Sequence, residues 1–180
     1  MNTIEKSGFT KWCTNKGLEI ADREWPIYKS TEPLSFLIKL PDNPYRGVAL
    51  ARMCFPGRVN SPFKGAMVWF REWGVWNKVD EETGMQTVQR LRAALGETRP
   101  LIEAPGHLFS VQEFPDARAF WNVPMIFGWD AILFPESADY FVFNSHDEVV
   151  AFVSRTKETH SQLMEDLKDW NPEVSAWYFR

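Results

Sequence analysis

The stretch AMVWFREW, residues 66–73, predicts a buried β-strand around which we expect the rest of the chain to fold. Successive side chains of a strand point to opposite faces of a sheet. One face of this strand therefore carries Met67 and Trp69, and the other carries Val68 and Phe70. Because both faces are apolar, we expect the strand to lie in the interior of a sheet.

The flanking segments alternate between helical and strand-like patterns. The clearest helix is expected over residues 80–95, where Val88, Leu91 and Leu95 follow helical spacing and Gly96 ends the helix. Farther along, the expected elements are a strand at 107–111, a helix from Pro115 to Gly128, strands at 131–134 and 139–143, a helix that begins after Ser145, and another over 157–169. Before residue 66, we expect a helix within 3–16 and an antiparallel hairpin of strands 34–40 and 47–55.

This order of elements predicts an α/β protein. Strands that alternate with helices imply parallel βαβ crossovers, so we expect residues 66–73, 107–111 and 131–134 to run parallel in the middle of a mixed sheet. Flanking hairpins would add antiparallel strands, and an α+β arrangement is the alternative. With 180 residues, of which 44% are hydrophobic, residues 1–180 are expected to form a single globular domain.

The charge and the cysteine content argue against several classes of function. A formal net charge of −4 disfavours binding to nucleic acid or to an anionic membrane, because both need basic side chains. There is no run of about 18 apolar residues for a spanning helix, and the first residues lack the apolar stretch of a signal peptide. A cytoplasmic protein is therefore expected. Cys13 and Cys54 lack CxxC spacing and are expected to be free thiols, and neither a metal nor a cofactor is predicted.

Three short segments stand out from the rest of the sequence. They are EWGVW at 72–76, EAPGHLF at 103–109 and FNSHDE at 143–148. None of them contains a standard catalytic or nucleotide-binding motif. Together they resemble segments of a group of uncharacterised bacterial proteins. The resemblance covers the middle and the later half of the chain, and it implies a bacterial source without bringing an activity.

The histidines are the residues best suited to acid–base chemistry. His107 follows a Pro-Gly turn and could act as a general acid or base with Glu103 as its orienting carboxylate. A turn histidine that is hydrogen-bonded to the backbone is the structural alternative. Ser145 and Glu148 fit a helix capping box, which accounts for both residue types. His160 lies in a polar helical run and is expected on the solvated surface.

The expected topology gathers some of these candidates at one edge of the sheet. His107 and Asp130 would lie at the edge where the parallel strands start. The next strand would return antiparallel and bring His146 and Asp147 to the same edge, so these residues form the candidate catalytic cluster. Glu72 would lie at the opposite edge and outside the cluster.

The aromatic content of 15% suggests binding as well as packing. Trp73, Trp76, Trp177 and Tyr178 are the candidate binding residues, because tryptophan and tyrosine are enriched at binding hot spots. Small size, acidic charge and the lack of catalytic motifs favour a non-enzymatic protein of the bacterial cytoplasm that binds another protein, as immunity and regulatory proteins do. The alternative is a small hydrolase or small-molecule-binding enzyme that uses the histidines and nearby carboxylates.

Overall fold

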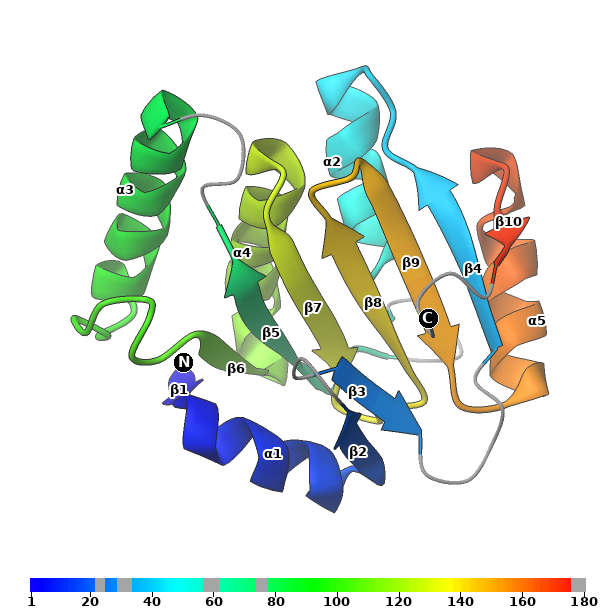
Figure 1. The fold of residues 1–180 in the computed structure, drawn as a ribbon, viewed down its shortest axis with the longest axis horizontal. Helices are drawn as coiled ribbons and strands as arrows, with labels where there is room; N and C mark the ends of the chain where they lie inside the picture. Colours follow the sequence, from blue (N-terminus) through cyan, green and yellow to red (C-terminus); the bar gives the residue numbers. More distant parts are fainter. Residues whose placement is uncertain (22–24, 29–33, 57–61, 74–77, 176–180) are drawn as a thin grey trace.

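Strands from all parts of the chain assemble into one large antiparallel sheet (Figure 1). The computed structural model describes residues 1–21, 25–28, 34–56, 62–73 and 78–175. The strands of the large sheet are β1 (Asn2–Ile4), β4 (Leu34–Lys39), β5 (Gly65–Glu72), β6 (Gly106–Ser110), β7 (Asp130–Pro135), β8 (Tyr140–Ser145), β9 (Val149–Ser154) and β10 (Glu173–Val174). They lie in the order β1-β6-β5-β7-β8-β9-β4-β10, and each neighbouring pair is antiparallel.

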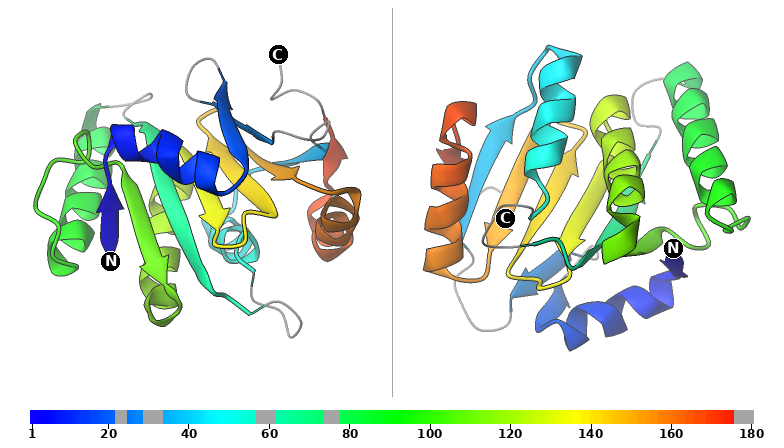
Figure 2. Two further views of the ribbon diagram at one scale, coloured as in Figure 1. Left: turned by 90° about the horizontal axis from the view of Figure 1, so that it is seen from below. Right: turned by 180° about the vertical axis from the view of Figure 1, so that it is seen from behind.

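Helices and a small hairpin cover the two faces of this sheet. The helices are α1 (Lys6–Asn15), α2 (Pro44–Met53), α3 (Lys78–Ala94), α4 (Phe114–Phe127) and α5 (Lys157–Asp166), and β2 (Leu18–Ala21) pairs with β3 (Trp25–Tyr28). Helices α2, α4 and α5 lie on one face with α3 beside α4, whereas α1 and the β2–β3 hairpin lie on the other (Figure 2). The class predicted from the sequence is confirmed in its α+β form.

Aromatic rings dominate both cores. The larger core lies under α2, α3, α4 and α5 and includes Phe70, Phe120 and Trp121. The smaller core lies under α1 and the hairpin, where Phe9 stacks on Trp69 with ring centroids 4.0 Å apart. Since each buried aromatic ring removes a large apolar area from water, much of the aromatic content is used in packing.

The expected parallel crossovers are wrong, because β5 runs opposite to the predicted direction. β6 and β7 both pair with β5 in antiparallel register, so they share one direction and α4 carries the chain between them. After α3, residues 95–105 turn the chain back before β6 begins, and the Phe70 N–H donates to the Pro105 carbonyl at 3.1 Å. As a result, β5 ends at the same end of the sheet at which β7 begins. We call this the upper end of the sheet, as it lies at the top of Figure 1.

The strand predicted over 47–55 is also wrong, because this segment forms most of helix α2. The side chain of Asn43 accepts hydrogen bonds from two backbone N–H groups of the first turn, and Pro44 occupies that turn. Leu50 and Cys54 are four residues apart, and both side chains are fully buried, as expected for the inner face of a helix. In the sheet, β4 therefore pairs with β9 and β10 and not with the segment that follows it.

The helix predicted after Ser145 is a hairpin turn between β8 and β9. Ser145 Oγ accepts a hydrogen bond from the Asp147 N–H at 3.1 Å, and the Glu148 N–H donates to the Ser145 carbonyl at 3.2 Å. A capping serine makes similar local contacts, so the local pattern fits both structures. The hairpin turn forms in place of a helix because the segment after it, β9, pairs with β8 on one side and with β4 on the other. The next helix begins only at Lys157.

The helix predicted over 80–95 is confirmed as α3. Val88 is fully buried, and Leu91 and Leu95 are partly buried against the larger core. Gly84 marks a close approach of α3 to the chain that precedes β7. A Cβ atom at this position would lie 2.6 Å from Trp129 Cζ2 and 2.9 Å from Phe127 Cγ. The glycine is therefore needed for packing, although a glycine within a helix is otherwise unfavourable.

We expect Gly84→Ala to destabilise the protein by about 1–3 kcal/mol, the usual cost of overpacking a core. The ring of Trp129 is buried and cannot move into solvent. Gly47→Ala in α2 is the matched control, because its new Cβ would have no atom within 4 Å beyond the adjacent residues and the backbone of its own helix. There, alanine should stabilise by about 0.5–1 kcal/mol through helix propensity. Urea unfolding of both variants measures the difference, and equal stabilisation by both would contradict the close packing.

Both cysteines are free, as expected, and both are buried. Cys13 lies in the smaller core and Cys54 in the larger one. Burial raises the pKa of each thiol to about 12, so neither forms a thiolate at neutral pH. Among the described residues, no helix is long and apolar enough to cross a membrane.

Candidate functional site

Three side chains that can bind a cation meet at the upper end of the sheet. Glu72 is the last residue of β5 and lies opposite Asp130, the first residue of β7, with an irregularity in the register between Phe70 and Glu72. His146 follows directly after β8. One potential ligand atom of each of these three residues lies within 4.8 Å of the other two. We call them the Glu72–Asp130–His146 cluster.

Asp130 fixes the orientation of His146. Its Oδ1 accepts a hydrogen bond from the His146 backbone N–H at 2.9 Å and lies 2.8 Å from ring Nδ1. Asp130 is buried, whereas the imidazole is partly exposed, with Nε2 3.7 Å from Oδ1 of Asp147. The imidazole is thus held by one carboxylate and flanked by a second. Such an arrangement orients a histidine for acid–base chemistry or for metal binding.

The carboxylates set the electrostatics of this cluster. Burial lowers the pKa of His146, but the hydrogen bond to Asp130 and the charges of Asp130, Asp147 and Glu72 outweigh burial, so the pKa lies above its ordinary value. Glu72 and Asp130 are opposite each other in an antiparallel pair, where like charges destabilise a sheet. A protonated imidazole or a bound cation between them would offset this repulsion.

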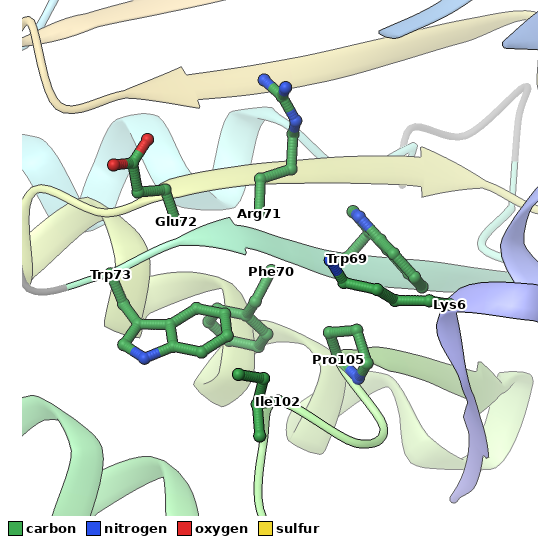
Figure 3. Close-up of a pocket in the computed structure, with 8 residues that line it drawn as sticks. All are labelled: Lys6, Trp69, Phe70, Arg71, Glu72, Trp73, Ile102 and Pro105. Atoms are coloured by element: carbon green, nitrogen blue, oxygen red, sulfur yellow. The ribbon is translucent and has the colours of Figure 1, made fainter. Parts of the chain in front are cut away.

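An open pocket of about 250 Å³ lies beside β5 and has Glu72 in its lining (Figure 3). Its apolar lining comes from Trp69, Phe70, Trp73, Ile102 and Pro105, and its charged lining from Lys6, Arg71 and Glu72. Arg71 and Glu72 extend to one side of β5, and Trp73 and Ile102 lie toward the other (Figure 3). Glu72 therefore belongs to both the pocket and the cluster.

Arg71 is held over an aromatic ring beside this pocket. Its guanidinium carbon lies 4.1 Å from the centroid of the Trp25 ring, and Trp25 in turn meets Phe143 edge-on at 4.7 Å. Stacking of this kind orients a guanidinium without removing its charge. The positive charge of Arg71 thus lies on the same side of β5 as Glu72.

His107 does not join His146. It begins β6 toward the same end of the sheet, but it pairs with Val68 and its ring lies between Phe70 at 5.6 Å and Phe120 at 4.8 Å. The side chain is fully buried, and this burial, with a smaller effect of the Arg92 charge, lowers its pKa to about 3. The ring is thus a neutral part of the aromatic core. The expectation that both histidines share one site is not met.

The other predicted site residues have different surroundings. Glu103 is exposed in the turn before β6, and Asp147 is exposed beside the imidazole of His146. Trp73 is partly buried and lines the pocket. The predicted binding residues Trp76, Trp177 and Tyr178 lie outside the described residues.

Sequence reasoning did not identify the residues that complete the pocket and the cluster. The expectation that Glu72 lies at the opposite edge is wrong, because its position depends on the direction of β5. Lys6 comes from α1, and Ile102 from the segment that turns the chain back before β6. The only signal that could have suggested Ile102 was its position beside the EAPGHLF segment.

No protein-family model matches this chain, and no curated protein or solved structure shows significant similarity to it.

Proposed function

We propose that this chain is a non-enzymatic, protein-binding protein of the bacterial cytoplasm, of the immunity or regulatory type, and that its partner inserts a side chain into the pocket beside β5. The observation that carries this proposal is the size and lining of the pocket. Its volume of about 250 Å³ is below the roughly 300–1,000 Å³ of small-molecule sites. A pocket of this kind suits one anchoring side chain of a protein partner.

The lining of the pocket has the composition of a binding hot spot. Tryptophan is enriched in hot spots, and apolar anchors are usually surrounded by polar groups that form a rim. Trp73 and Ile102 supply the apolar surface, and the exposed fraction of Ile102 is 63%. Lys6, Arg71 and Glu72 supply charges of both signs around it. The anchor that suits such walls is an aliphatic or aromatic side chain.

Affinity capture with two matched variants tests this function. We expect the wild-type chain to retain one protein from a lysate of the source cells in near-stoichiometric amount. Ile102→Glu should reduce its recovery at least tenfold, a loss of about 1.4 kcal/mol or more. Val111→Glu is the control, because Val111 is 49% exposed and does not line the pocket. Failure to retain a protein, or equal recovery with Ile102→Glu, would exclude the pocket as the contact.

A small-molecule-binding enzyme, such as a hydrolase, is the second candidate function. The observation in its favour is that Glu72 joins the pocket to the oriented pair of Asp130 and His146. This function would be supported by a small molecule that stays bound through purification and is released on denaturation. Mass spectrometry would identify the molecule. Stoichiometric capture of a protein, sensitive to Ile102→Glu, would favour the first candidate instead.

A further inference from the structure

We propose that the Glu72–Asp130–His146 cluster is a binding site for a divalent transition-metal ion, with zinc as the ion tested. This inference goes beyond the proposed function, because metal binding can be measured without any partner or substrate. It rests on the convergence of three ligand types from three places in the sequence. Glu72 ends β5, Asp130 begins β7, and His146 follows β8.

The spacing of the potential ligand atoms suits a shared ion. Ligands at about 2.0–2.2 Å from a tetrahedral zinc ion lie roughly 3.3–3.6 Å from one another. The three atoms here are within 4.8 Å of one another. Small rotations of the Glu72 side chain, which is exposed, can close this difference. The backbone positions of the three residues therefore need not change.

The charges of the cluster favour a cation. Glu72 and Asp130 are directly opposite in the β5–β7 pair, where two carboxylates repel each other. A divalent ion bound by both would replace that repulsion with attraction. Asp147, whose Oδ1 lies 3.7 Å from His146 Nε2, adds a further negative charge. The shift of register between Phe70 and Glu72 is also typical of sites where a bulge redirects a side chain.

The donor set indicates which ions are suitable. An imidazole nitrogen favours zinc, iron or nickel over calcium and magnesium, which prefer oxygen ligands. Three protein ligands would leave a fourth position of a tetrahedral ion for water or another group. Because Glu72 also lines the pocket, that ion would lie at the border of the pocket.

Asp130 supports the site in a second way. Its Oδ1 is already hydrogen-bonded to the backbone N–H and close to the ring Nδ1 of His146, so the imidazole is oriented before an ion arrives. An ion bound by both Asp130 and Nδ1 would take the place of the proton between these two atoms. Little side-chain entropy would then be lost on binding.

Isothermal titration of the tag-free, chelator-treated full chain with zinc chloride tests this proposal. We expect one zinc ion per chain. Glu72→Gln and His146→Asn should each weaken binding at least tenfold, whereas His160→Asn should leave it unchanged. Loss of a coordinating group should cost no less than the 10–100-fold typical of a residue that only orients a ligand. The buried Cys13 and Cys54 thiols, with pKa values of about 12, do not compete at neutral pH.

Two further measurements test whether zinc binds at the Glu72–Asp130–His146 cluster. A cobalt-substituted sample should show visible absorption bands of a protein-bound ion, and Glu72→Gln should change them. Zinc should also raise the melting temperature of the wild-type chain but not of Glu72→Gln, whose exposed position makes it the variant expected to fold normally. Absence of zinc binding by the wild-type chain would overturn the proposal. Binding that both Glu72→Gln and His146→Asn leave intact would also overturn it. Neither result bears on capture of a protein partner through Ile102.

Discussion

His107→Leu is expected to make the protein markedly less sensitive to acid. The side chain of His107 is fully buried, and burial, together with a smaller effect of the Arg92 charge, lowers its pKa from 6.5 to about 3. The nearby carbonyls of Val68 and Pro105 and the charge of Glu97 act in the opposite direction but do not outweigh burial. Between these two pKa values, the unfolded chain binds a proton at this residue and the folded chain does not.

The sign of the effect follows from this difference. Stability rises with pH wherever the unfolded state binds more protons, so the contribution of His107 is lost as the pH falls from about 6.5 toward 3. The loss is about 1.4 kcal/mol per unit of pH. Between pH 7.5 and 4.5, His107 should therefore remove about 2–3 kcal/mol from the free energy of unfolding. In His107→Leu, the leucine does not titrate, so the part of the acid-induced loss of stability that comes from His107 should be absent.

Urea unfolding at pH 7.5 and 4.5 measures the contribution of His107 to the free energy of unfolding. The difference in stability between the two pH values should shrink by about 2–3 kcal/mol in His107→Leu relative to the wild-type chain. His160→Leu is the control, because His160 is only partly buried and its pKa is lowered less strongly. An unchanged difference in His107→Leu would show that this histidine can be protonated in the folded chain.

Asn144→Ala is expected to lower the free energy of unfolding by about 2–4 kcal/mol. Asn144 is fully buried in β8, and its Nδ2 donates to the Pro124 carbonyl at 3.1 Å and to the Trp129 carbonyl at 2.9 Å. The Pro124 carbonyl also accepts from the Trp129 N–H, but this bond remains in the variant. The substitution removes two hydrogen bonds and leaves the Trp129 carbonyl to be satisfied in another way.

Thermal unfolding compares the stability of Asn144→Ala with that of the wild-type chain. For a chain of this length, about 2–4 kcal/mol corresponds to a fall in melting temperature of roughly 5–15 °C. Asn122→Ala on the partly buried side of α4 is the control and should change stability by about 0.5 kcal/mol or less. Since Trp129 precedes Asp130, the variant should also weaken zinc binding by the Glu72–Asp130–His146 cluster. A small loss in Asn144→Ala would mean that water or a rearranged backbone replaces both bonds.

The sequence by itself determined the elements whose periodicity is local and unambiguous. Helix α3 was predicted from the spacing of Val88, Leu91 and Leu95, and β5 from the alternation along residues 66–73. The approach of His146 to Asp130 was also predictable, because a short turn joins β7 to β8 and brings the end of one strand to the start of the other. None of these three inferences needed a contact between distant parts of the chain.

Only the tertiary structure decided the direction of β5 and the turn after Ser145, whereas helix α2 has a local signal in the Asn43 cap and Pro44. A helical connection does not fix strand direction, because residues 95–105 can turn the chain back before it enters β6. The contacts of Ser145 with the next backbone N–H groups fit a helix cap and a hairpin turn alike, and the pairing of β9 with β4 and β8 favours the turn. The meeting of Glu72 with Asp130 and His146 also depended on the tertiary structure, because it requires β5 to pair with β7. Which strands pair depends on burying both faces of the sheet. Burial of both faces is a property of the whole chain and not of any single segment.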